Sequence, residues 1–217
     1  MDKQVDILII GAGISGIGVA AHLSQNCPQR SFEIIERRES FGGTWDFFKY
    51  PGIRSDSDMS TFGFNFKPWQ KANVLADGAS IKGYLLEVLD EYKLKEKIHF
   101  QHRVLAANYD STQKKWLVEI EDANQKKQTW IANFVLGCTG YYNYDQGFQP
   151  DFPNQQEFKG QFIHPQLWPE NLDYRGKKVV IIGSGATAIT LVPAMAKGGA
   201  AHVTMLQRSP TYIASVP

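Results

Sequence analysis

Apolar and polar positions follow the same order in two separate parts of the chain. In the first part, the apolar run Val5–Ile10 predicts a buried parallel strand, because it is short, continuous and followed directly by glycine. A helix with small residues on its packing side is expected over Ile14–Leu23, and a second strand over Ser31–Glu36. The pattern therefore predicts a strand–turn–helix–strand unit of the Rossmann type.

The second part repeats this order close to the C-terminal end. Its predicted strand, glycine turn and second strand are Lys178–Ile182, Gly183–Ala188 and His202–Gln207, with a helix that ends near Lys197. Pro217, the last residue, follows soon after the second strand. Because a three-layer α/β domain does not close its sheet with two strands, we expect this second domain to be truncated. The expected fold class is α/β, with two Rossmann-like dinucleotide-binding units.

The pattern between these units is less regular. Ser80–Tyr92 has the helical spacing of apolar residues, whereas Phe41–Trp69 is rich in glycine and aromatic residues and predicts a long ordered loop with short helical turns. Further strands are expected near Val104–Asp110, Trp116–Glu121 and Trp130–Gly137.

The loop-rich stretch Tyr141–Arg175 contains several prolines and predicts a linker between two domains. We therefore expect a first domain over residues 1–145, a linker over 146–175 and the start of a second domain over 176–217.

Composition excludes several classes of protein. The chain has 217 residues and a net charge of +1 with acids and bases interspersed, so it has no basic face for nucleic acid. Cys27 and Cys138 form no C-x-x-C pair, which argues against a disulfide scaffold, a metal site and a dithiol redox centre and favours the cytoplasm. The apolar stretch Ile7–Leu23 is short and interrupted by glycine, so it is neither a signal peptide nor a transmembrane segment. Peripheral membrane association stays open.

The first glycine turn carries a dinucleotide fingerprint, Gly11-x-Gly13-x-x-Gly16, between a strand and a helix. The first glycine permits a tight turn, the second lets a diphosphate approach the backbone, and the third lets helix and strand pack closely. The helix start then offers free N–H groups to the phosphates. Glu36, at the end of the next strand, would accept hydrogen bonds from ribose hydroxyls and repel a 2′-phosphate, which indicates FAD or NAD.

The second turn has the variant Gly183-x-Gly185-x-x-Ala188. Arg208 and Glu36 both stand 25 positions after the first glycine of their turn, so we expect Arg208 to take the place of Glu36. A guanidinium pairs with a 2′-phosphate, and the second unit is therefore expected to bind NADP. The alternative interpretations are ordinary glycine turns and solvated surface charges.

Two further segments carry a family resemblance. FKGQFIHPQLWP, from Phe158 to Pro169, resembles the F-x-G-x-x-x-H-x-x-x-W-P fingerprint of Baeyer–Villiger and related class B flavin monooxygenases. GGTWDFFKYPGIRSDSD, from Gly42 to Asp58, looks like the flavin-side loop of that family, and the closing HVTMLQRSPTY is most similar to its ethionamide-activating branch. The resemblance covers essentially the whole chain and implies a three-layer FAD-binding domain followed by an NADP-binding domain.

The resemblance also implies roles for individual residues. The FAD-binding residues would be Gly11, Gly13, Ser15, Gly16, Glu36, Thr44, Trp45 and, through its backbone at the adenine, Val104. The NADPH-binding residues would be Gly183, Gly185, Thr187, Ala188, Gln207 and Arg208.

Two residues are the candidate catalytic-site residues. Asp56 matches the aspartate that lies beside the flavin ring and positions an active-site arginine, which we expect beyond Pro217; Arg54 and Ser55 flank it and would touch the nicotinamide nucleotide. His164 would couple domain motion to cofactor use. On the residues alone, Asp56 could instead cap a turn, as Asp58 could, and His164 could be an ordinary loop histidine.

The implied reaction consumes NADPH and O2 and inserts one oxygen atom into a ketone, or oxidises a soft heteroatom such as sulfur in a small molecule. The alternatives are an N-hydroxylating flavin monooxygenase, which the linker fingerprint disfavours, and a non-catalytic dinucleotide-binding fragment.

Overall fold

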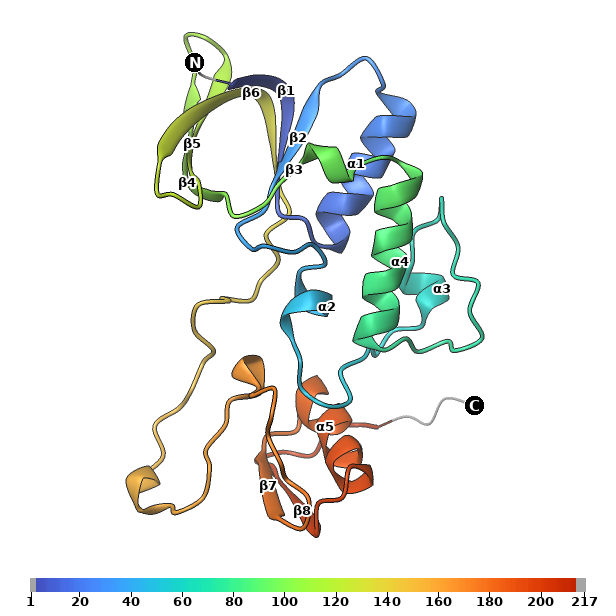
Figure 1. Cartoon of the computed structure of the whole chain (residues 1–217), viewed down its shortest axis with the longest axis vertical. Helices are drawn as coiled ribbons and strands as arrows, with labels where there is room; N and C mark the ends of the chain where they lie inside the picture. The colour runs from blue at the N-terminus through green and yellow to red at the C-terminus, as the bar shows by residue number, and fades with distance from the viewer. Residues whose placement is uncertain (1–2, 214–217) are drawn as a thin grey trace. The chain divides into compact units, whose positions relative to one another are not determined.

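The computed structural model describes residues 3–213 (Figure 1). Contacts between residues divide this part of the chain into two compact units. The first unit comprises residues 3–46, 64–67 and 79–141, and the second comprises residues 47–63, 68–78 and 142–213.

The first unit is built on a mixed six-stranded sheet with the order β3-β2-β1-β6-β5-β4. Strands β3, β2, β1 and β6 are parallel, whereas β5 and β4 continue the sheet as an antiparallel meander. Continuous apolar runs in β1 and β2 fit strands that are buried on both faces. The strands are β1 Lys3–Ile10, β2 Phe32–Ile35, β3 Ile98–His99, β4 Arg103–Asp110, β5 Lys115–Glu121 and β6 Lys127–Gly137.

Two helices of the first unit, α1 Ile14–Asn26 and α4 Gly78–Glu91, pack through the ring of Phe64. This ring stacks on Tyr84 of α4 and fills the space beside Gly18 of α1, where a Cβ would lie 2.6 Å from it. Small residues on α1 thus allow close packing. The 3-10 helix η1, Lys95–Lys97, leads into β3.

The second unit contains a two-stranded parallel sheet, β7 Lys178–Ile182 and β8 His202–Leu206, connected by α5 Ala186–Lys197. Its core joins α5 and β7 to aromatic residues of an earlier segment, and consists of Phe48, Tyr50, Ile181, Ala188, Leu191 and Met195. The short elements are α2 Thr44–Phe47, which crosses the boundary between the units, α3 Met59–Phe62, η2 Gln155–Glu157 and η3 Pro165–Leu167.

The expected strands and helices are present, and the predicted α/β fold is confirmed. The pattern missed β3, which is only two residues long. It also did not indicate that residues 47–63 pack in the same compact unit as the second glycine turn. Gly52 explains this packing: its φ is +85°, and a Cβ there would lie 2.5 Å from the Thr190 carbonyl oxygen and 2.8 Å from Ala194 Cβ. The functional domain boundaries 1–145, 146–175 and 176–217 remain a prediction.

Within the described residues, Cys27 and Cys138 are free thiols. None of the helices over 3–213 combines the length and apolar character that crossing a bilayer requires. In this same part of the chain, no three histidine, cysteine, aspartate or glutamate side chains gather where they could hold a metal ion.

Candidate dinucleotide-binding sites

The three glycines of the first turn meet different surroundings. Gly11 has a φ of +108°, and a Cβ there would overlap the Cys138 carbonyl oxygen; a Cβ on Gly16 would overlap the Gly11 carbonyl oxygen. These two positions therefore require glycine for the protein's own packing. At Gly13, by contrast, Gly43 Cα at 3.7 Å is the only atom near a Cβ position among the described residues.

Gly13 stands at the start of a helix whose first N–H groups point toward the glycine turn. Gly13 is the N-cap residue of the 13-residue helix α1, and no side chain within residues 3–213 forms a capping hydrogen bond there. The first-turn N–H groups, with partly exposed Gly13 and exposed Ser15 beside them, can therefore donate to an anion. The turn thus has the strand before it and the helix after it that the fingerprint predicts, and the diphosphate site stays a prediction.

Glu36 is buried, with 6% of its surface exposed, and both of its carboxylate oxygens bind backbone amides. Oε2 accepts from the Ala12 N–H at 2.8 Å, and Oε1 accepts from the Arg38 N–H at 2.9 Å. Each oxygen has a second acceptor direction, so the carboxylate can hold the glycine turn and still accept from a ribose hydroxyl.

Val104 lies close to this region along the chain. The N–H of His102 donates to the Glu36 carbonyl at 3.0 Å, and that of Gln101 donates to the Arg38 carbonyl at 3.0 Å. Val104 follows at the start of β4, where the pairing with β5 has a bulge. Val104 thus follows two residues after an amide that binds the end of β2, and its adenine contact stays a prediction.

A second loop approaches the first glycine turn. The Gly42 N–H donates to the Ala12 carbonyl at 2.9 Å, and Thr44 and Trp45, both partly buried, begin α2. Asp46, in the same helix, is buried and forms ion pairs with Arg38 at 2.5 Å and with Lys82. We did not predict Asp46 as a site residue, and no local sequence pattern marks it as one.

The second glycine turn reproduces the backbone of the first. Gly185 begins α5 with φ −79° and ψ −177°, compared with −81° and −173° for Gly13. No atom of the described residues lies within 4 Å of a Cβ placed on Gly183 or Gly185. Thr187 is partly buried and Ala188 buried, so alanine is accommodated at the third position.

The strand register corrects the expected match between Glu36 and Arg208. Ile10 pairs with Ile35 in the first unit, and Ile182 pairs with Leu206 in the second. The residue that follows Leu206 is Gln207, so Gln207 and not Arg208 occupies the position of Glu36. This holds although Glu36 and Arg208 both stand 25 positions after the first glycine of their turn. Arg208 is the next residue.

Both Gln207 and Arg208 are exposed. The link between the turn and the end of β8 comes from other side chains: Ser184 Oγ donates to the Ser209 carbonyl at 3.0 Å, and Thr211 Oγ1 donates to the Ser184 carbonyl at 2.6 Å. Within residues 3–213 no partner holds the Arg208 guanidinium, which leaves it available to an anion. The second unit therefore has a neutral side chain where the first has a carboxylate, followed by a cation.

The segment around Asp56 is a turn fixed by its neighbours. Ser55 is buried; its hydroxyl donates to the Ser57 carbonyl at 2.8 Å and accepts from the Ser57 N–H at 3.1 Å. Asp58 accepts from the N–H and the hydroxyl of Thr61, both at 2.9 Å, and so caps α3. The turn-capping alternative is thus confirmed for Asp58. Asp56 and Arg54 are exposed, and Asp56 has no hydrogen-bond partner among the described residues.

His164 is held within the linker by contacts on both ring nitrogens. Nδ1 accepts from the Gln166 N–H at 3.2 Å, so Nε2 carries the proton that it donates to the Phe148 carbonyl at 3.2 Å. A Cβ on Gly147 would overlap the ring. Gln166, which we did not predict, is buried, and its side-chain amide donates to the Asn143 carbonyl at 2.6 Å. These bonds join the segment 143–148 to the segment 164–166.

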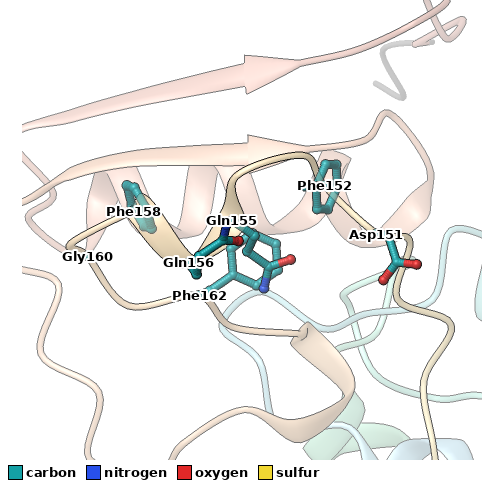
Figure 2. A pocket seen from close by; sticks show the side chains of 7 residues that line it. All are labelled: Asp151, Phe152, Gln155, Gln156, Phe158, Gly160 and Phe162. Carbon is teal, nitrogen blue, oxygen red and sulfur yellow. The ribbon is translucent and has the colours of Figure 1, made fainter.

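The remaining fingerprint residues also have packing roles. The ring of Phe158 lies over Gly160, where a Cβ would be 2.6 Å away, and Trp168 packs against the core of the second unit. Figure 2 shows the open hollow that this part of the linker forms, with Phe152, Phe158 and Phe162 among its lining residues.

The predicted site residues thus fall into two groups. Those of the first turn, with Glu36, Thr44, Trp45 and Val104, lie in the first unit, and those of the second turn lie in the second unit together with Arg54, Ser55, Asp56 and His164.

Comparisons with known proteins identify the family to which the chain belongs. The sequence profile of a family described as "Flavin-binding monooxygenase-like" matches residues 2–216. The chain is 82% identical over its whole length to "Probable FAD-binding monooxygenase AlmA" of Acinetobacter baylyi, and 56% identical to "FAD-containing monooxygenase EthA" of Mycolicibacterium smegmatis, covering 44% of each. It therefore spans less than half the length of these relatives.

A solved structure described as "Oxidized steroid monooxygenase bound to NADP" is similar to 97% of this chain and 40% of its own, with 28% identity and a TM-score of 0.81. The family resemblance found in the sequence is thereby confirmed.

Proposed function

The chain belongs to the flavin-binding monooxygenase-like family, and from this premise we propose that it forms the FAD-binding and part of the NADPH-binding portion of a monooxygenase. The observation that carries the proposal is the pair of glycine turns with the same backbone, one followed by a buried carboxylate and the other by an exposed arginine. The relative named as FAD-binding and the similar structure named as bound to NADP support the two cofactors.

In the first unit, Gly13, Ser15 and the first turn of α1 would bind the diphosphate of FAD, with Gly11 and Gly16 shaping the turn. Glu36 would accept from the ribose, and Thr44, Trp45 and the backbone of Val104 would contact the rest of the cofactor. Bound FAD would supply the redox chemistry for activating dioxygen, which protein side chains lack.

In the second unit, Gly183, Gly185, Thr187 and Ala188 would bind the diphosphate of NADPH, with Gln207 and Arg208 at the 2′-phosphate. The absence of a carboxylate at position 207 removes a repulsion, and the guanidinium of Arg208 adds an attraction. Arg54 and Ser55 would touch the nicotinamide nucleotide. Asp56 would hold a cation near the reacting atoms, and His164 would fix the linker.

We propose a ketone or a compound with a soft heteroatom such as sulfur as the small-molecule substrate, with O2 as co-substrate. The family profile supports oxygenation. The two free cysteines support a reducing, cytoplasmic setting.

The test is the visible spectrum of the purified protein. We expect bound flavin that is bleached by NADPH under exclusion of air, and much faster than by NADH. Bound flavin that neither nucleotide reduces would favour a nucleotide-binding part without activity of its own. A colourless protein that takes up no added FAD would contradict the proposal.

Arg208→Ala tests the nucleotide preference. We expect NADPH binding to weaken by about 2 kcal/mol, roughly thirtyfold, because a charge-assisted pair to the 2′-phosphate is lost, while NADH binding stays unchanged. Arg175→Ala is the matched control, since that side chain is 83% exposed and belongs to the same unit. Equal weakening for both nucleotides would show that Arg208 does not contact the phosphate.

A further inference from the structure

Asp46 is the centre of a cluster of charged side chains in the first unit. Its side chain is 7% exposed and pairs with Arg38, at 2.5 Å, and with Lys82 of α4. Burial raises the pKa of Asp46, but hydrogen bonds and ion pairs from Lys82 and Arg38 outweigh burial and hold the pKa below its usual value. The folded protein therefore keeps this carboxylate ionised.

The same two cations contact the loop that precedes Asp46. Lys82 Nζ donates to Ser40 Oγ at 3.2 Å and lies 5.3 Å from the centre of the Phe41 ring. Arg38 Nη1 donates to the Gly43 carbonyl at 3.5 Å, and the N–H of Asp46 donates to this carbonyl at 3.1 Å. Three parts of the first unit thus contact this loop: α4 through Lys82, the segment after β2 through Arg38, and α2 through Asp46.

Two neighbouring glycines make this loop costly to order. Gly42 and Gly43 have φ values of +109° and +53°, and glycine loses more conformational freedom on ordering than other residues do. A loop with two such residues needs tertiary contacts to stay in one conformation. The Asp46 cluster supplies them, since a Cβ on Gly42 would lie 3.1 Å from Asp46 Cβ and 3.6 Å from Lys82 Cγ.

The loop forms one wall of the space above Gly13. Its Gly42 N–H binds the Ala12 carbonyl at 2.9 Å, and Gly43 Cα lies 3.7 Å from the Cβ position of Gly13. A displacement of the loop would therefore narrow or open the space in which the diphosphate would bind.

We propose that Asp46, paired with Arg38 and Lys82, is a positioning residue that fixes the Gly42–Gly43 turn beside Gly13 before FAD binds. This inference rests on the proposed function. A site that is formed in advance binds its ligand more tightly, because no conformational entropy of the loop is lost when the ligand binds. The carboxylate also keeps two cations on the loop, so that they serve as supports and not as ligands of the phosphates.

The test measures FAD affinity of the full chain by flavin fluorescence, at a temperature where circular dichroism shows each apoprotein to be folded. Asp46→Asn keeps the shape and removes the charge, and we expect FAD to bind about tenfold more weakly, with NADPH affinity unchanged. Asp46→Glu restores the charge and should recover part of the loss. Asp90→Asn is the matched control, because Asp90 is exposed and paired with Lys95 at 2.5 Å; it should change FAD affinity less than twofold.

Unchanged or tighter FAD binding by Asp46→Asn overturns the positioning role, since tighter binding would mean that the freed cations contact the phosphates directly. If Asp46→Asn does not fold, Lys82→Met, which leaves the Arg38 pair intact, replaces it. About threefold weaker binding then supports the role and unchanged binding overturns it. A wild-type chain that binds no FAD overturns the proposed function together with the positioning role. A wild-type chain that binds FAD no more tightly than Asp46→Asn does overturns the positioning role alone.

Discussion

Glu36 illustrates how one side chain serves both fold and site. Its two oxygens accept from the Ala12 and Arg38 amides, so Glu36→Gln places an NH2 group against a backbone donor. We expect the free energy of unfolding of the apoprotein to fall by about 1–3 kcal/mol, together with FAD affinity. Urea denaturation of the apoprotein measures the first effect. Glu39→Gln, at an exposed position, should change neither. A Glu36→Gln variant that loses FAD affinity but keeps the full stability of the apoprotein would contradict the structural role of Glu36 and leave only its contact with the ribose.

At the residue scale, the sequence predicted the two glycine turns, each between a strand and a helix, but not the register of the charges. Counting from Gly11 and Gly183 assumed equal spacing, whereas α1 has 13 residues and α5 has 12. One residue fewer in the helix moves Gln207 into the position of Glu36. Asp46 was not predictable either, because its two cations come from Arg38 and from Lys82, which is 36 residues away.

At the scale of elements, the linker depends on one glycine. A Cβ on Gly147 would overlap the His164 ring, so Gly147→Ala should expel the ring and break its bonds to Phe148 and Gln166. We expect a loss of about 1–3 kcal/mol in the free energy of unfolding, measured by urea denaturation. Because His164→Ala removes the same contacts, the double variant should be little worse than either single variant.

Gly83→Ala is the matched control for this change. Gly83 lies in α4 with no atom within 4 Å of its Cβ position, so alanine should stabilise the helix by about 0.5–1 kcal/mol. Additive losses for Gly147→Ala and His164→Ala would show that the glycine and the histidine do not share one contact.

The strand and helix pattern was predictable because each element has its own periodicity, but the packing partner of a loop is not encoded locally. The aromatic loop after Trp45 belongs to the second unit since Phe48 and Tyr50 are buried beside α5, and Gly52 permits the close approach. These contacts link residues more than a hundred positions apart. Only the resemblance to a family predicted that Arg54 and Ser55 would touch the nicotinamide nucleotide, and this stays a prediction.

At the scale of the whole molecule, the two glycine turns differ in what surrounds them. Gly11 is packed against Cys138 at the end of β6, whereas no described atom lies within 4 Å of a Cβ on Gly183. The sheet that carries Gly183 also leaves Val180, Ile182 and Leu206 at least half exposed. Within residues 3–213, the first glycine turn therefore packs against other parts of the chain, whereas the predicted site of the second unit rests on fewer contacts.

Acid stability is a property of the first unit's carboxylates taken together. Burial raises the pKa of Glu33, but hydrogen bonds from His99 and Lys3 outweigh it and lower the pKa; Asp46 behaves likewise. A pKa that is lower in the folded than in the unfolded state stabilises the protein above the unfolded value, near 4, and this stabilisation is lost as the pH falls further. We therefore expect the free energy of unfolding to decline below about pH 5. Glu33→Gln should lower stability at neutral pH and flatten this decline in urea titrations at constant ionic strength. Stability that rises as the pH falls from 5 to 3 would contradict the prediction, because it would require the folded state to bind more protons than the unfolded state.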